Sequence, residues 1–158
     1  MAHVQRFRHM DSKGTIKLPV LSATAIDVGF LCYYDAADDT VKPFSAQADQ
    51  TSLALNQALW KDNFAGVAVT GHVANDPVED VTLATEGVFE FECAATAWDA
   101  FALVGADEEA GIPGAGSNFR VIAAAAQTDA IGRVWKKYTA TTTRVLVRIS
   151  GNRTTNTV

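Results

Sequence analysis

The chain has 158 residues, a length typical of a single domain with one core. Its 48% hydrophobic and 20% charged residues exclude a wholly disordered, a collagen-like and a mucin-like protein. No run reaches the roughly 18 apolar residues that cross a bilayer, and the N-terminus holds no apolar signal core, so we expect neither a membrane span nor a secretory signal.

The formal net charge of −5 is distributed unevenly along the chain. Residues 1–17 carry four basic side chains and one acidic one, and residues 133–158 carry six basic ones and none that is acidic. Between them lie three basic and 17 acidic side chains. The two basic ends either offset the acidic body within one folded chain or dock on a partner's surface. Nucleic acid is a poor candidate partner, because the body repels phosphate and no basic patch is interleaved with aromatic residues.

Residues 1–14 show no clear period, and we expect an extended arm in which Arg6 and Arg8 project to one side of the backbone and Phe7 to the other. Strand patterns then recur to the end of the body. They cover residues 15–20, 30–34, 40–44, 64–70, 81–83, 88–93, 119–124, 131–138 and 143–149. In the clearest of them, Phe89, Phe91 and Cys93 share one face of the strand, which predicts a core position for these side chains.

One segment, residues 51–61, favours a helix, with Asp49 placed as its N-cap. Residues 94–110 fit either a short helix or a strand that leads into a turn at 107–109, and a loop is expected at 111–116. The pattern predicts an all-β domain over residues 15–150, a compact β-barrel or β-sandwich of about eight or nine short strands with one short helix. An extended N-terminal arm (1–14) and a flexible C-terminal tail (151–158) flank it.

The sequence offers little for catalysis or metal binding. The glycine-rich loop lacks the lysine of a phosphate-binding loop, and the acidic run with Asp35 and Asp38 lacks the glycine and distal glutamate of a calcium-binding EF-hand. His72, at the end of a strand pattern, is expected at the surface. Glu90 and Glu92 lie on one side of a strand about 7 Å apart, which suits paired catalytic carboxylates but also describes ordinary surface glutamates. We therefore expect no catalytic, cofactor-binding or metal-binding residue.

The two cysteines, Cys32 and Cys93, each lie within an apolar strand-like run. This setting favours buried free thiols over a disulfide, and it favours a reducing compartment.

Several stretches, taken in order, resemble the capsid decoration (cement) family of tailed bacteriophages. They are residues 27–35, 40–43, 63–68, 81–91 and 130–134, within a resemblance that extends over roughly residues 15–150. Residues 84–90, with the sequence Ala-Thr-Glu-Gly-Val-Phe-Glu, are similar to a strand pair that recurs in the family.

The resemblance implies a structural virion protein, made in the bacterial host cytoplasm, that forms homotrimers on the outer surface of a phage capsid. There it would stabilise the shell by bridging major capsid proteins, with no nucleic-acid or membrane partner and no enzymatic activity. The residues expected to contact the capsid are Val4, Arg6, Phe7, Arg8 and Lys13 of the arm. Trp60, Trp98 and Trp135 are candidates for the subunit interface, although a core position suits each of them better. Two alternatives stay open, a phage tail or baseplate component and a small hydrolase that uses Glu90 and Glu92.

Overall fold

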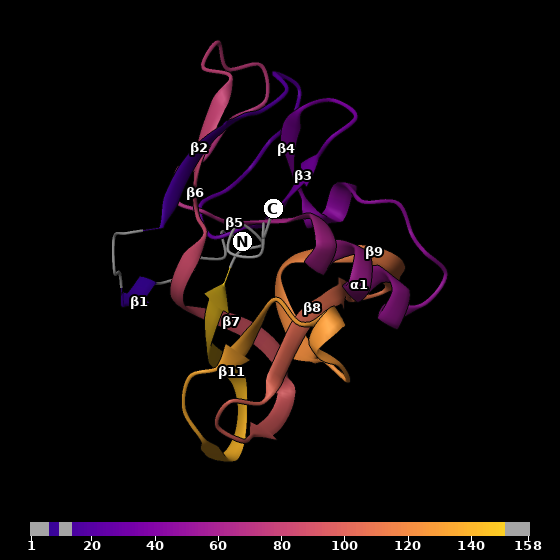
Figure 1. Ribbon diagram of the computed structural model, residues 1–158, viewed down its shortest axis with the longest axis vertical. Helices are drawn as coiled ribbons and strands as arrows, with labels where there is room; N and C mark the ends of the chain where they lie inside the picture. The colour runs from indigo at the N-terminus through magenta and orange to yellow at the C-terminus, as the bar shows by residue number, and fades with distance from the viewer. Residues whose placement is uncertain (1–6, 10–13, 151–158) are drawn as a thin grey trace, which may run out of the picture.

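A computed structural model describes residues 7–9 and 14–150 of the chain (Figure 1). Its strands are β1 (Phe7–His9), β2 (Thr15–Pro19), β3 (Leu31–Asp35), β4 (Thr40–Pro43), β5 (Phe64–Ala68), β6 (Asp80–Ala84), β7 (Glu86–Trp98), β8 (Leu103–Glu109), β9 (Ile112–Ala123), β10 (Gly132–Val134) and β11 (Tyr138–Ser150). The helices are α1 (Leu53–Asn63) and two short 3-10 turns, η1 (Phe44–Ala46) and η2 (Gln127–Asp129). The prediction of an all-β domain with one short helix is confirmed.

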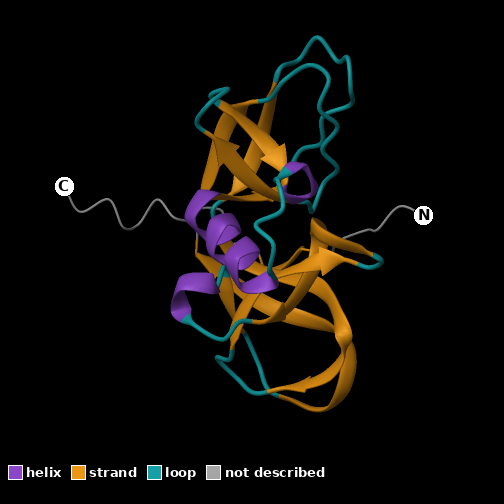
Figure 2. Cartoon of the chain, turned by 90° about the vertical axis from the view of Figure 1, so that its right-hand side faces the viewer, coloured by secondary structure: helices purple, strands orange, loops and turns teal. Residues whose placement is uncertain are grey.

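The strands form two sheets, which lie one above the other in Figure 2 with α1 beside their junction. The six-stranded sheet has the order β1-β7-β11-β10-β8-β9, and β9 pairs back onto β7 where Glu92 meets Arg120. This last pairing closes β7, β11, β10, β8 and β9 into a barrel. The five-stranded sheet has the order β2-β6-β5-β3-β4, with β2 and β4 at its edges. A single bridge between Val20, directly after β2, and Val41 of β4 brings these two edges together at one end.

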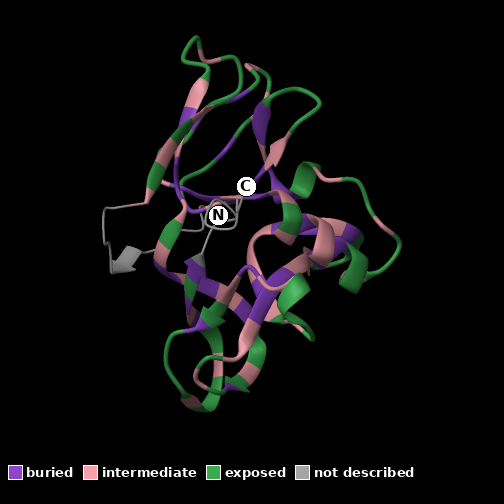
Figure 3. Ribbon diagram, in the orientation of Figure 1, coloured by how far each residue is buried: buried purple, intermediate pink, exposed green. Residues whose placement is uncertain are grey.

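The main core fills the barrel and continues to one face of the smaller sheet. On β7 the predicted alternation is observed, because Phe89, Phe91 and Cys93 are buried. On β3, Leu31 belongs to this main core, while Cys32 points to a second, smaller core on the other face of the smaller sheet. Figure 3 shows the buried residues gathered where the sheets and α1 meet, with exposed residues concentrated in the loops at the two ends.

Helix α1 lies within two residues of its predicted bounds but has a different N-cap. The side chain of Ser52 accepts a hydrogen bond from the Leu55 N–H, whereas Asp49 accepts bonds from the Thr51 N–H and the Asn56 side chain. Asp49 is therefore not the N-cap. It lies in the turn before the helix and stabilises the first helical turn through its bond to Asn56. The helix is tied to the barrel by Gln57, whose buried side-chain amide donates a 3.0 Å hydrogen bond to a β8 carbonyl.

Two predictions for the middle of the chain are wrong. Residues 107–109 belong to strand β8 and not to a turn, and most of 111–116 belongs to strand β9 and not to a loop. The glycines of β9 have a packing role there. A Cβ atom on Gly116 would lie 2.8 Å from the Trp60 ring, and one on Gly114 would lie 2.3 Å from the Asp49 side chain. The strand therefore runs directly against α1 and the turn before it, where side chains do not fit.

The body, residues 14–150, begins and ends beside two consecutive residues, Thr85 and Glu86. The Thr85 hydroxyl group donates a 2.9 Å hydrogen bond to the carbonyl of Gly14, just before β2. The next residue, Glu86, pairs with Ser150 at the end of β11. Both ends of the body therefore lie at the junction between β6 and β7, where the chain passes from the smaller sheet to the barrel.

Candidate functional site

The predicted arm contributes a strand to the larger sheet. Phe7 and Arg8 lie in β1, which is antiparallel to β7 with Phe7 opposite Phe89, while Val4, Arg6 and Lys13 lie outside the described residues. β1 is the terminal strand in the order of this sheet. A terminal strand presents backbone N–H and C=O groups that a partner strand can pair with.

The three tryptophans occupy different environments. Trp60 and Trp98 are 0% and 4% exposed and belong to the main core, whereas Trp135 is 44% exposed. Neither ring of Trp60 and Trp98 reaches the surface of the protein, so neither is available to an interface between copies of this chain. Trp135 follows β10 and remains available to a partner.

Glu90 and Glu92 lie on the same side of β7, as expected, with Arg144 of β11 beside them. The Arg144 guanidinium group approaches the carboxylate oxygens of Glu90 and Glu92 at 3.3 and 3.9 Å. An arginine that bridges two carboxylates makes an ion-pair cluster across two barrel strands. This gives the pair a structural role in joining β7 to β11.

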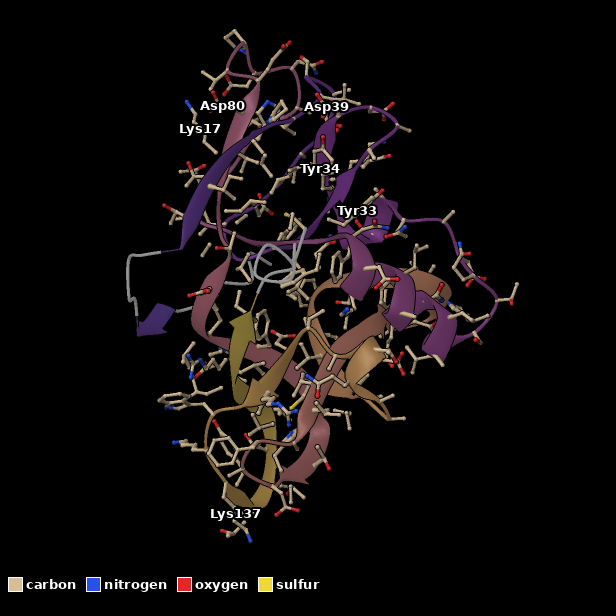
Figure 4. All side chains as sticks on the ribbon, in the orientation of Figure 1. Lys17, Tyr33, Tyr34, Asp39, Asp80 and Lys137 are labelled. Carbon is tan, nitrogen blue, oxygen red and sulfur yellow. The ribbon has the colours of Figure 1, made fainter. Side chains whose placement is uncertain are left out.

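The acidic run after β3 forms the turn of the β3–β4 hairpin and is paired with a lysine. The Lys42 ammonium group donates a 2.6 Å hydrogen bond to Asp35 and a second one to Asp38. The Tyr34 hydroxyl group donates to Asp39, and both residues are labelled in Figure 4. The bond from Lys42, followed by the bond from the Ala37 N–H, lowers the pKa of the Asp35 carboxyl group. The turn is thus stabilised by its own counter-charge. Within the described ranges, no group of three or more His, Cys, Asp and Glu side chains is placed to hold a metal ion.

The prediction of free, buried cysteines is confirmed for Cys32 and Cys93. Burial raises the pKa of both thiol groups, which makes the reactive thiolate scarce. The surface position predicted for His72 is wrong, since this side chain is 4% exposed. Its backbone pairs with Ile26 in a neighbouring loop, and its Nδ1 atom lies 2.6 Å from the Thr24 carbonyl oxygen.

Sequence reasoning missed a recess of about 420 Å³ on the smaller sheet. Ile16 and Leu18 of edge strand β2 form one side of it, with Tyr34 and the end of α1 on the other. The alternation of Ile16 and Leu18 signalled a half-buried strand, but the recess depends on distant segments that no local pattern brings together. The lining is mixed, because Asp62, Asn63 and Thr85 lie beside the apolar side chains. In the part of the chain that the structure describes, no helix is long and apolar enough to span a membrane.

Comparison with protein families places the chain beside known proteins. A family model described as phage cement protein matches residues 46–149. The match begins before α1 and includes nearly all of the closed barrel, from β7 to the penultimate residue of β11. No curated protein matches the chain. Because the family model covers well over half of the sequence, this chain belongs to the phage cement protein family.

Proposed function

We propose that this protein is a structural component of the phage virion that binds the outer surface of the capsid and bridges major capsid proteins. The family match over residues 46–149 is the observation that supports this proposal. Under it, the protein is made in the host cytoplasm, assembles onto the head and needs neither nucleic acid nor a membrane. It has no enzymatic role.

The described body offers the properties that such a role requires. A closed barrel gives a rigid scaffold, and the terminal strands β1 and β2 offer backbone groups to a partner. The groups that sequence reasoning considered for chemistry have structural partners instead. Arg144 bridges Glu90 and Glu92, and the cysteine thiols are buried. These features favour a binding protein over a small hydrolase.

The capsid-binding element in this proposal is the arm, residues 1–14. In an extended strand the guanidinium groups of Arg6 and Arg8 project to one side and the Phe7 ring to the other, so the arginines meet carboxylates while the ring fills an apolar depression. Val4 and Lys13 add an apolar and a cationic contact at the ends. Each arm residue that becomes ordered only on the capsid costs about 1 kcal/mol, so the contact must bury apolar surface or extend a sheet.

The same proposal includes a homotrimer, because three-fold positions on an icosahedral head are most simply covered by rings of three copies. Among the tryptophans, Trp135 is the one whose exposure suits an interface between copies. Aromatic side chains are enriched at the centres of such interfaces.

Electron microscopy of intact virions tests the location, and deletion of residues 2–12 tests the arm. We expect density for this chain on the outside of the head. The truncated protein should keep its thermal transition but lose occupancy on expanded, undecorated heads, while the full chain saturates them. Density on the tail or baseplate alone would contradict the capsid proposal. Full occupancy of the heads by the truncated protein would show that the arm is not needed for binding.

A further inference from the structure

Most of the exposed large apolar side chains lie on two surfaces. Among the described residues eight such side chains are exposed, and six of them fall into two groups. The apolar tip, in loops 20–29 and 69–79, consists of Leu21, Val28, Val73 and Val78. The basic patch, around β10 and β11, consists of Phe101, Arg133, Trp135 and Arg148. The loops of the tip extend beyond β2 and β6 at the top of Figure 1, and β11 lies in the opposite half.

The apolar tip is an ordered surface, because its two loops are hydrogen-bonded to each other. Ile26 and His72 exchange backbone bonds of 2.9 and 2.8 Å, and the Asn75 N–H donates to the Ser22 carbonyl at 2.6 Å. These bonds hold the loops together while Val73 stays 72% exposed. A fixed group of aliphatic side chains in water marks an interaction surface better than scattered exposed residues do.

The tip is also acidic. Asp27, Asp76 and Glu79 lie in the same two loops, and no ion pair to any of them forms within residues 14–150. The nearby Lys17 is paired with Asp80 at 2.8 Å, at the start of β6 (Figure 4). The aliphatic side chains are therefore accompanied by negative charge that the described body does not neutralise.

The basic patch has the opposite charge. Arg133 of β10 lies directly opposite Arg148 of β11. Arg133 donates hydrogen bonds to two neutral acceptors, the Phe101 carbonyl at 3.0 Å and the Gln127 side chain at 2.7 Å, and among the described residues neither arginine forms an ion pair. Like charges directly opposite each other on neighbouring strands are unfavourable. A carboxylate from outside the chain would relieve this repulsion.

Aromatic side chains and a recess complete the patch. Phe101 is 68% exposed and Trp135 is 44% exposed, and both are held next to β10, since Phe101 donates its N–H to the Val134 carbonyl. A recess of about 280 Å³ opens between Arg133, Arg148 and their neighbours. Exposed aromatic side chains beside arginines are the composition found at the energetic centres of protein interfaces.

We propose that the apolar tip of one copy of this chain docks on the basic patch of a second copy. The aliphatic side chains of the tip would cover the recess and the aromatic rings, and its carboxylates would face Arg133 and Arg148. Because the two surfaces differ, the contact is head-to-tail, and successive contacts close a ring when the rotation between copies allows it. The number of copies in the ring rests on the proposed function, which includes a trimer. The contact between two copies does not, and it can be tested without capsids.

Paired variants test the contact. The tip variant combines Val73→Gln with Glu79→Gln, and the patch variant combines Arg133→Gln with Arg148→Gln. A control, Leu55→Gln with Lys61→Gln, removes one exposed apolar side chain and one charge from α1, away from both surfaces. Mass is measured by light scattering at about 100 µM, where a contact with a Kd of about 10 µM is largely formed. Circular dichroism checks that each variant is folded.

The wild type and the control should form species larger than one chain, and each variant alone should associate at least about 10-fold more weakly. An equimolar mixture of the two variants should give a 1:1 dimer, because each retains the surface that the other has lost. A wild type that stays a monomer, a variant that associates normally, or a mixture that stays monomeric would each overturn the inference. Should a variant not fold, Val78→Gln with Asp27→Asn replaces the tip pair and Trp135→Ser replaces the patch pair.

Binding to undecorated heads is measured on the same proteins. This measurement distinguishes a failure of the capsid function from a failure of the head-to-tail contact. Self-association without any binding to heads contradicts the capsid function and leaves the head-to-tail contact standing. Binding to heads by a wild type that does not self-associate contradicts the contact alone.

Discussion

The indole ring of Trp60 stacks on the phenyl ring of Phe44, with ring centroids 5.8 Å apart and planes inclined by 16°. Trp60 belongs to α1, and Phe44 belongs to η1, which directly follows edge strand β4 of the smaller sheet. Both side chains are fully buried, and the Cβ position of Gly116 in β9 lies against the indole. One ring pair thus joins the helix, the smaller sheet and the barrel.

Replacing this indole should strongly destabilise the fold. We expect Trp60→Ala to lower the free energy of unfolding by about 3–5 kcal/mol, because it leaves a cavity among three packed elements. Trp135→Ala, at an exposed tryptophan, should cost less than about 1 kcal/mol. Urea denaturation followed by circular dichroism measures both. Equal losses at the two positions would contradict the central role of the Trp60–Phe44 pair.

The Lys42–Asp35 pair should make stability depend on pH. Lys42 lowers the pKa of Asp35 in the folded protein, so this carboxylate stabilises the fold above its unfolded pKa of about 3.9, and the contribution is lost as the pH falls through the folded pKa. Lys42→Met should therefore lower Tm at pH 7 and flatten the fall of Tm below about pH 4. Lys61→Met serves as the control. If Tm falls equally with decreasing pH in the wild type and in Lys42→Met, the Lys42–Asp35 pair is not the source of the pH dependence.

The two thiols should be unreactive in the folded protein. Cys32 is 0% exposed and Cys93 is 6% exposed, and burial raises the pKa of both, so a thiol reagent at pH 8 should label neither within minutes. Both should react fully in denaturant. Rapid labelling of one thiol under native conditions would reveal local opening of the core around it.

Association with heads should slow as salt is added, because the acidic body and the basic segments steer the encounter electrostatically. We expect the association rate constant to fall several-fold between about 0.02 and 0.5 M salt, with a smaller change in the dissociation rate. Surface plasmon resonance on immobilised undecorated heads measures both rates. An association rate that does not change would mean that these charges balance one another within the fold.

Removing the paired glutamates tests whether they serve only the stability of the fold or also the binding to heads. Glu90→Ala with Glu92→Ala removes both partners of Arg144, and we expect a small loss of stability with full binding to heads retained. Occupancy on heads and Tm are the measurements. Arg144→Ala is the matched control, because it breaks the same cluster from the other side. Loss of occupancy in a folded double variant would give the glutamates a direct role.

Local patterns predicted the parts of the fold in which neighbouring residues decide the outcome. The alternation of Phe89 with Phe91 on β7 is such a case, because side chains on one strand face report which side meets the core. Helix α1 is another, since three turns of helical spacing are visible in its sequence. The positions of Cys32 and Cys93 followed from the same apolar runs.

The remaining features depend on contacts between distant segments. The glycines of β9 resemble a loop in sequence, yet Gly116 is required because the Trp60 ring passes where its Cβ would be. His72 is polar and ends a strand pattern in the sequence, but the backbone of loop 20–29 is hydrogen-bonded to it. The facing pair of Arg133 and Arg148 arises from the register of β10 on β11, which neither strand encodes alone.

Gly14 and Ser150 both lie beside Glu86, which makes this body suited to circular permutation. A short linker from 150 to 14 would replace residues 1–13 and 151–158 in one step, with new ends placed in the β3–β4 turn. A protein permuted in this way would keep the barrel, the smaller sheet and the pairing of β11 with β7. A second protein fused ahead of residue 14 or behind residue 150 would project from the same place on the surface of the body. Either end is therefore equally suited to carrying it.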